Sequence, residues 1–282
     1  MQKKIIALSL LLFAILEISP VVFLATGAFM DSREIIELIG PILSDQKSYA
    51  SWRLLPRYPT MKNLVGLLFD SPEFFQMFWN TVKITGGILL GQMLLGMPAA
   101  WGLARYSFRG KRWIYLLYVV MMMMPFQVTM LSEYLVLDTF KMLDTSAAVI
   151  LPGMFSTFPV FIMYRFFGGI PESVLEAARM DGAGEWQVFV QMGIPLGISG
   201  IRSVLVLSFL ECWCMIEQPM TFLKTKSLWP LSMFLPQLDA DNIGMSLCAS
   251  LLALLPAVFV FLAGQDDLEQ GIASWAGKEG RR

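Results

Sequence analysis

The chain has 282 residues, of which 56% are hydrophobic and 15% are charged, and its formal net charge is −1. Soluble globular proteins carry roughly 25% charged residues, so this composition argues against a soluble enzyme and for a protein embedded in membrane lipid. The near-neutral charge gives no reason to expect a nucleic-acid partner, and the absence of histidine removes the commonest general base and metal ligand.

Six hydrophobic runs are long enough to cross a hydrocarbon core, which needs about 20 residues. We expect these spans at about 5–30, 78–104, 113–137, 146–167, 201–223 and 243–263. The first run is roughly 25 residues long, whereas the apolar region of a signal peptide has only about 7–15, so we interpret it as a retained anchor. The sequence therefore predicts an all-α, polytopic membrane protein with six transmembrane helices.

Lysine and arginine in the loops set the expected orientation. The short loop 105–112 carries four basic residues, and such density beside a span marks the cytoplasmic side. Both termini then lie in the cytoplasm, as does the polar stretch 169–200. We expect an N-terminal anchor with an external loop over 1–77, a transmembrane core over 78–264 and a cytoplasmic tail over 265–282.

The polar stretch 169–200 predicts a helix–turn–helix outside the bilayer. Its first helix begins at Pro171, which suits a first helical turn, and stops at Gly182, which tolerates a left-handed backbone. Its second helix covers 185–192 and is expected to end before Pro195. A soluble element between two spans suggests that something outside the bilayer binds it.

This stretch resembles the EAA loop of ABC-importer permeases, whose pattern is approximately E-A-A-x-x-D-G-A, then Phe, then I-x-L-P. The residues that match in type and spacing are Glu176, Ala177, Ala178, Asp181, Gly182, Ala183, Phe189 and Pro195. Met192 and Ile194 stand where the family usually has Ile and Leu, and Ser199 takes a position that often holds proline in sugar permeases.

In that family the EAA helix docks in a groove on the ATPase subunit. The resemblance therefore implies a set of ATPase-coupling residues: Glu172, Glu176, Ala177, Ala178, Asp181, Gly182 and Ala183. The alternative is an amphipathic surface helix whose glutamates only pair with basic neighbours such as Arg179. The chain has no G-x-x-x-x-G-K-[ST] motif, so we expect ATP hydrolysis in a partner chain, and neither enzymatic activity nor a cofactor or metal here.

Other segments resemble the maltose-type carbohydrate permeases, in particular the six-helix partner of the pair. They are YSFRGKR (106–112), MMMPFQVTML (122–131), LDTSAAVILP (143–152), RFFGGIPE (165–172), and a tryptophan–proline signature at Trp213 and 219–223 in which Cys214 replaces asparagine. The resemblance implies a multi-pass subunit in a bacterial plasma or inner membrane that imports a sugar by alternating access. Its implied partners are a second permease, with which it forms a heterodimer, two ATP-binding subunits and an extracytoplasmic sugar-binding protein.

Polar and aromatic side chains within the spans are candidates for the substrate path, because a sugar needs hydrogen-bonding groups and aromatic faces. The candidates are Gln127, Glu133, Glu211, Trp213 and Glu217, with Glu17, Gln92 and Gln218 as further intramembrane polar residues. Hydrogen bonding between helices is the alternative role for each. An ATPase-independent secondary transporter or channel stays open as a second function, since it also needs carboxylates within spans.

Overall fold

The computed structural model describes residues 2–43, 53, 55–234 and 243–279. All regular structure in these ranges is helical, which confirms the predicted all-α fold. Four helices are long and apolar enough to cross a membrane: Ile6–Gly27, Pro72–Arg105, Ser146–Gly168 and Ile243–Glu269. The number rises to six when two bent pairs count as one span each: Lys111–Met123 with Phe126–Thr139, and Glu185–Leu196 with Ile198–Trp213.

The third predicted span, 113–137, is not one helix. It consists of α6 (Lys111–Met123) and α7 (Phe126–Thr139), which meet at an angle of 105°. Pro125 lacks an N–H and disfavours helical backbone in the residue before it, and Met124 is extended at φ −77° and ψ 121°. The span predicted at 113–137 is thus formed by two helices that meet at this proline.

The fifth predicted span, 201–223, is also divided. Helix α13 (Ile198–Trp213) ends at Cys214, and the short helix α14 (Glu217–Phe222) follows it. Pro219 is the third residue of α14, and a proline fits the first turn of a new helix but not the interior of a longer one, which agrees with the break before Glu217.

The chain divides into two compact units. Unit 1 comprises Met1–Gln76 and Phe234–Pro256, and unit 2 comprises Met77–Met233 and Ala257–Arg282. The helices of unit 1 are α1 (Gln2–Gly27), α2 (Ser32–Leu43), α3 (Lys62–Phe69), the start of α4 (Pro72–Gly91) and the start of α15 (Ile243–Glu279). Met30, Ile35, Leu38 and Ile243 form the small core of this unit.

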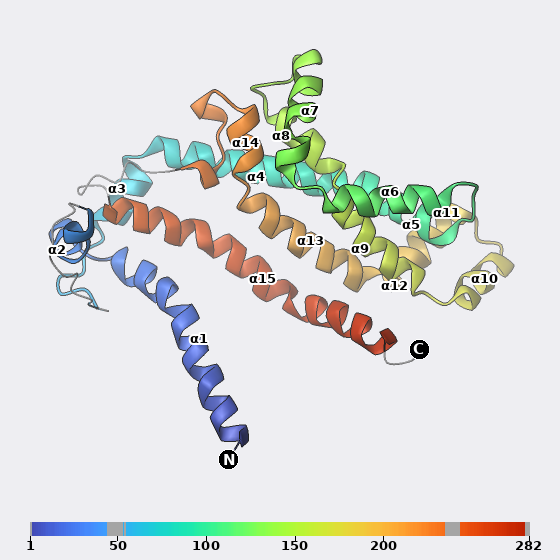
Figure 1. Cartoon of the computed structure of the whole chain (residues 1–282), viewed down its shortest axis with the longest axis horizontal. Coiled ribbons are helices and arrows are strands. Elements are labelled where there is room, and N and C mark those ends of the chain that lie inside the picture. Colours follow the sequence, from blue (N-terminus) through green and yellow to red (C-terminus); the bar gives the residue numbers. More distant parts are fainter. Residues whose placement is uncertain (1, 44–52, 54, 235–242, 280–282) are drawn as a thin grey trace. The chain divides into compact units, whose positions relative to one another are not determined.

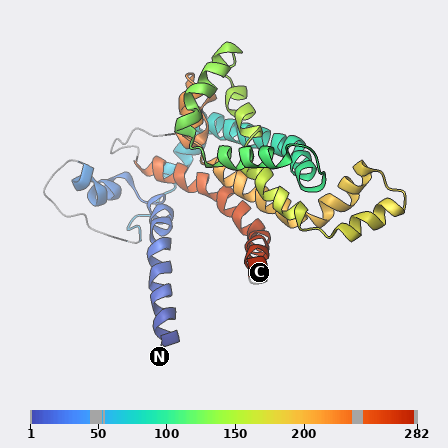
Figure 2. The ribbon, with the colours of Figure 1, turned by 45° about the vertical axis from the view of Figure 1, so that its right-hand side comes forward.

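Helix α1 presents its apolar side chains outward. No part of its most hydrophobic window is buried, and Glu17 is exposed in the middle of the helix. Within unit 1, only the end of α1 lies beside other helices, and its start extends away from α2 and α3 (Figures 1 and 2). Within its own unit, therefore, no described residues cover the Glu17 side chain.

Unit 2 is a bundle built around the rest of α4, α5 (Met97–Arg105), α9 (Thr157–Gly168) and α13. Its other elements are η1 (Gln92–Gly96), α8 (Ser146–Met154), α10 (Glu172–Met180), α11 (Glu185–Val188), η2 (Phe189–Gly193), α12 (Ile194–Leu196), η3 (Lys226–Leu228) and η4 (Leu231–Met233), with α6, α7, α14 and the end of α15. Segments η1 and η2 are π-helical, whereas η3 and η4 are 3-10 turns.

The core that positions the 169–200 stretch is centred on Trp101 of α5. Its ring lies 5.3 Å from the ring of Phe167 on α9 and 5.5 Å from that of Phe189 in η2. Leu175 of α10 is fully buried in the same cluster. Gly193 approaches Trp101 so closely that a Cβ there would lie 2.6 Å from the indole. The two helices of the stretch are therefore packed onto the bundle and do not hang free.

Candidate functional site

Helix α10 is a short amphipathic helix at one end of unit 2 (Figure 1). Pro171 precedes it with an extended backbone (φ −60°, ψ 133°), so the proline caps the helix from outside and Glu172 is the first helical residue. Leu175 faces the core, whereas Glu176 and Ala177 are exposed. The face that carries the predicted coupling motif is thus the one that α10 leaves uncovered.

The turn after α10 confirms the predicted stop at Gly182. This glycine has φ +88°, a left-handed conformation that side chains with a Cβ rarely adopt. The Gly182 N–H donates to the Arg179 carbonyl (3.0 Å), and the Ala183 N–H donates to the Ala178 carbonyl (3.1 Å). These two bonds form a Schellman motif, which fixes the direction in which the chain leaves α10.

The second helix of the stretch continues further than predicted. Segments α11, η2 and α12 run from Glu185 to Leu196, so the prediction that the helix ends before Pro195 was wrong. The Ile194 N–H donates to the carbonyl of Phe189, five residues back. Pro195 directly follows this widened turn, where the α-helical pairing is already interrupted, so the N–H that it lacks costs the helix little.

An open groove of about 740 Å³ separates α10 from α11 and η2. It is lined by Ser173, Val174, Ala177, Ala178, Asp181, Gly182, Ala183, Gln187, Val188, Gln191 and Met192. Five of the seven predicted coupling residues belong to this lining, and most of them have small side chains. A groove walled by alanine and glycine lets a partner's side chains approach the backbone closely.

The carboxylates around this groove fall into two classes. Arg179 binds Glu172 at 2.8 Å and Glu185 at 2.8 Å, and the hydrogen bond from Arg179 holds the pKa of Glu172 below its ordinary value. The carboxylates of Glu176 and Asp181 are exposed and form no ion pair or hydrogen bond with other described residues. The alternative in which the glutamates only pair with basic neighbours therefore describes Glu172, which binds Arg179, but not Glu176.

Arg105, at the end of α5, joins this stretch to the bundle. Its side chain is only 7% exposed, and its Nη1 lies 3.0 Å from a carboxylate oxygen of Glu172. Its Nη2 donates to the carbonyl of Phe167, in the last turn of α9, and to that of Ile170 just beyond this helix (2.7 Å for the latter). The guanidinium also stacks on the ring of Trp101, 5.5 Å from its centre.

Tyr106, the next residue, makes a second connection, since its hydroxyl donates to Glu185 at 3.0 Å. The basic charge of the loop 105–112 predicted the orientation and the segment 106–112 carried part of the family resemblance, but neither assigned Arg105 or Tyr106 to the site. The available signal was a basic residue and a tyrosine at a span end, in a chain whose polar stretch carries three glutamates.

The candidates for the substrate path are only partly brought together. The Gln127 amide of α7 donates to Glu217 of α14 at 2.7 Å, and the Thr221 hydroxyl contacts the sulfur of Met130 at 3.6 Å between the same helices. One carboxylate oxygen of Glu133 is buried and has no hydrogen-bond partner among the described residues.

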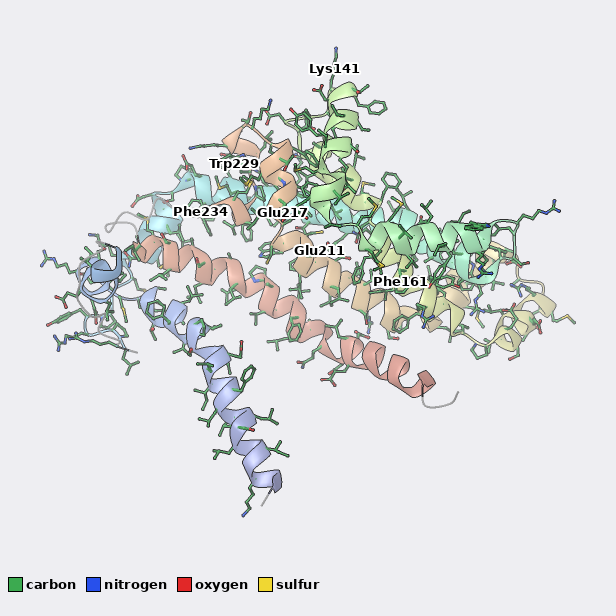
Figure 3. All side chains as sticks on the ribbon, in the orientation of Figure 1. Lys141, Phe161, Glu211, Glu217, Trp229 and Phe234 are labelled. Atoms are coloured by element: carbon green, nitrogen blue, oxygen red, sulfur yellow. The ribbon has the colours of Figure 1, made fainter. Side chains whose placement is uncertain are left out.

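The remaining candidates lie on α13. Trp213 is 6% exposed, with its ring 5.3 Å from Phe209 and 5.9 Å from Phe78, so the indole is covered in this conformation. Glu211 is exposed in the last turn of α13, at the end of unit 2 that also carries Glu217 (Figure 3). Gln92 donates to the Gly153 carbonyl at 3.1 Å, which is the helix–helix role that was the alternative for it.

At the α14 end of unit 2, Asp144 connects the loop before α8 to the segment after α14, and it has a left-handed backbone (φ +58°). Its carboxylate accepts hydrogen bonds from the backbone N–H groups of Lys224 (2.9 Å) and Thr225 (2.8 Å) and from the Thr225 hydroxyl (2.5 Å). Its own N–H donates to the Phe222 carbonyl at 2.9 Å. These bonds, with that of the Thr225 hydroxyl foremost, lower the pKa of Asp144.

Within the described ranges, no three acidic or cysteine side chains gather in a way that could hold a metal ion. Apolar spans, a polar two-helix element between them and a groove lined by five of the predicted coupling residues agree with the expected class, a membrane transport permease. A model of the binding-protein-dependent transport system inner membrane component family matches residues 92–274, and the chain belongs to this family.

Individual relatives agree with that assignment. The chain is 26% identical over 272 residues to the arabinooligosaccharides transport system permease protein AraQ of Bacillus subtilis (strain 168), covering 95% of this chain and 93% of the relative. It is 26% identical over 263 residues to the diacetylchitobiose uptake system permease protein NgcG of Streptomyces coelicolor, covering 91% and 82%. It is 25% identical over 248 residues to the sn-glycerol-3-phosphate transport system permease protein UgpE of Escherichia coli, covering 84% and 88%.

Among solved structures, the fold matches a chain of a bacterial ABC transporter that imports the acidic polysaccharide alginate. The TM-score is 0.78 at 19% identity, over 94% of this chain and 95% of the other. At this identity the match shows the fold alone.

Proposed function

We propose that this chain is the permease subunit of an ATP-driven importer and that α10 couples it to an ATP-binding partner. The observation that carries the proposal is the groove between α10 and α11, with Glu176 and Asp181 unpaired beside small residues that admit close contact. The other two carboxylates of the stretch are neutralised within the chain. A basic partner surface would therefore meet Glu176 and Asp181.

The predicted orientation and regions complete this proposal. The four basic residues of 105–112 support a cytoplasmic position for α10 and for both termini. Residues 78–264 then form the transmembrane core, preceded by an anchor and external loop (1–77) and followed by a cytoplasmic tail (265–282). We expect the chain to pair with a second permease, two ATP-binding subunits and an extracytoplasmic binding protein.

A sugar or oligosaccharide is the proposed cargo. Support comes from the relatives named for arabinooligosaccharides and diacetylchitobiose, while the relative named for sn-glycerol 3-phosphate supplies the competing class. Gln127, Glu133, Glu211, Trp213 and Glu217 are the proposed path residues. The Gln127–Glu217 pair offers an amide and a carboxylate, which are suited to sugar hydroxyls.

Two glycines give a matched test of the coupling surface. Gly182 and Gly110 have nearly the same left-handed backbone (φ +88° and +87°), and at neither would an added Cβ meet another atom. Substitution by valine therefore imposes similar backbone strain at both, but only Gly182 lines the groove. Gly182→Val should lower ATP-driven uptake at least about tenfold, equivalent to about 1.4 kcal/mol, whereas Gly110→Val should retain most of it.

The measurement is uptake of arabino-oligosaccharides, diacetylchitobiose and glycerol 3-phosphate into vesicles that contain the complex, with membrane insertion checked by immunoblot. Normal uptake by an inserted Gly182→Val variant would contradict the coupling assignment. Failure of any ATPase to co-purify with the wild-type chain, combined with ion-driven flux from the chain alone, would favour a secondary transporter instead.

A further inference from the structure

Five side chains close a ring of polar contacts, named here the Arg179 circuit: Arg105, Tyr106, Glu172, Arg179 and Glu185. Glu172 bridges Arg105 (3.0 Å) and Arg179 (2.8 Å), and Glu185 bridges Arg179 (2.8 Å) and Tyr106 (3.0 Å). The backbone between the neighbours Arg105 and Tyr106 completes the ring.

The circuit holds α10 at both of its ends. Glu172 is in the first turn and Arg179 in the last turn, while Glu185 opens α11. Arg179 uses Nε for one carboxylate and Nη1 for the other. A guanidinium can bridge two carboxylates in this way because its donors lie in one rigid plane, whereas a lysine presents a single point charge.

The fixed part of the circuit is the end of α5. Arg105 is nearly buried, stacks on Trp101 and donates to the carbonyls of Phe167 and Ile170, so its position is determined by the bundle core. Any displacement of α10 relative to α5 must break one of the bonds to Glu172 or Glu185. An isolated exposed ion pair resists such movement weakly, but a closed network with one buried member resists it at several points together.

The covalent route from α10 to the spans passes through η2 and α12 into α13, where the helix axis bends by 71°. We infer that the Arg179 circuit provides a second, non-covalent route, which carries movement of α10 directly into the continuous helix formed by α4, η1 and α5. Arg105 and Arg179 are then positioning residues: α10, α11 and the end of α5 move as one body. This inference rests on the proposed function, because α10 must be the element that a partner moves.

A cross-link in place of one contact tests this rigid connection. Tyr106 and Glu185 are both replaced by cysteine in a Cys214→Ser background, which removes the one exposed native cysteine, and a bifunctional maleimide then joins the two thiols. Before linking, amide hydrogen exchange over Glu172–Met180 in the purified chain should rise about tenfold, and linking should reverse the rise. The control pair Ser107→Cys and Met180→Cys lies outside the circuit, so exchange over α10 should stay unchanged before linking.

The second measurement is ATP hydrolysis and uptake by the assembled complex with its co-purified ATPases. We expect the unlinked Tyr106→Cys/Glu185→Cys variant to transport about tenfold less substrate for each ATP hydrolysed, and the linked variant to recover to within about twofold of wild type. If the Arg179 circuit only stabilised the fold, its loss would lower ATP hydrolysis and uptake together, and the ratio of transport to hydrolysis would not change.

Three results overturn the inference: unchanged amide exchange in the unlinked variant, an unchanged ratio of transport to hydrolysis, or a linked complex that is formed but inactive. The last would show that α5 and α10 must move apart during the cycle. Absence of ATP hydrolysis in the wild-type complex would instead refute the proposed function, and the exchange measurement would still decide whether the circuit holds α10 in place.

Discussion

At the α10 end of unit 2, three segments are joined by arginine–glutamate pairs. At the α14 end, the loop before α8 is joined to the segment after α14 by a single carboxylate that accepts backbone N–H groups. The first arrangement uses long side chains, which can exchange partners without moving the backbone. The second ties backbone to backbone through the short side chain of Asp144, whose own conformation is left-handed. The α10 end therefore depends on charge pairs between side chains, whereas the α14 end depends on bonds to the backbone.

The largest difference between the two ends should come from removing Arg105. Arg105→Leu removes one donor to the carbonyls of Phe167 and Ile170 and leaves Glu172 with Arg179 as its remaining arginine partner. We expect a loss of about 2 kcal/mol in the free energy of unfolding, the order found for hydrogen bonds to a charged group. Thermal unfolding in detergent measures it. Arg109→Leu is the control, because Arg109 is exposed in the same loop and makes no ion pair with the described residues.

A smaller and more local effect is expected from Asp144. Asp144→Ala removes the acceptor of two backbone N–H groups and places a Cβ-bearing residue without a polar side chain in a left-handed conformation. Amide exchange at Lys224 and Thr225 should accelerate, while that over α10 should not change. Asp144→Asn should have the weaker effect, because asparagine tolerates this conformation and keeps one acceptor oxygen.

Low pH should weaken the Asp144 contact, as Asp144→Ala does, and so lower the protection of the Lys224 and Thr225 amides against exchange. Its pKa is lowered in the folded chain, so its stabilisation is fully present above the unfolded value of about 3.9 and is lost as pH falls through the lower folded value. Exchange at Thr225 that is already fast at pH 7 in the wild type would show that the contact is not formed in solution.

Salt should produce the smallest effect and should separate the two ends most clearly. Raising ionic strength from 0.1 M to 1 M shortens the Debye length from about 10 Å to about 3 Å, which weakens partly exposed ion pairs. Glu172 is half exposed, so we expect exchange over α10 to rise about twofold, with no change at Lys224 and Thr225. An equal rise at both ends would remove the proposed distinction between them.

Local sequence signals predicted the parts of the site that depend on backbone geometry. The stop at Gly182 follows from glycine's access to left-handed backbone, and the start beside Pro171 follows from its fixed φ. The Arg179 circuit could not be derived in this way, because Arg105 and Glu172 are 67 residues apart and meet only through the packing of α5 against α9. Neighbouring positions suggested a pairing of Arg179 with Glu176 that tertiary contacts override.

The fold shows the same division between local and long-range causes. The apolar runs predicted that the chain is helical and crosses a membrane, and this reading is independent of how the helices pack. Hydrophobicity could not locate the bend at Pro125, which lies within an apolar run, or the break after Trp213, where the three residues between the helices are themselves apolar. The continuation of the helix through Pro195 depends on the π-helical turn before it, and no residue type predicts such a turn.

The two π-helical segments, Gln92–Gly96 and Phe189–Gly193, also bear on how the chain tolerates changes of length. Each holds one residue more than an α-helical turn of the same span. Deleting a residue elsewhere in an α-helix rotates everything beyond it by about 100°, but deleting one within a π turn can convert it to an α turn and preserve the register of the flanking helices. Gly193, whose Cα lies against Trp101, is the residue that such a deletion must spare.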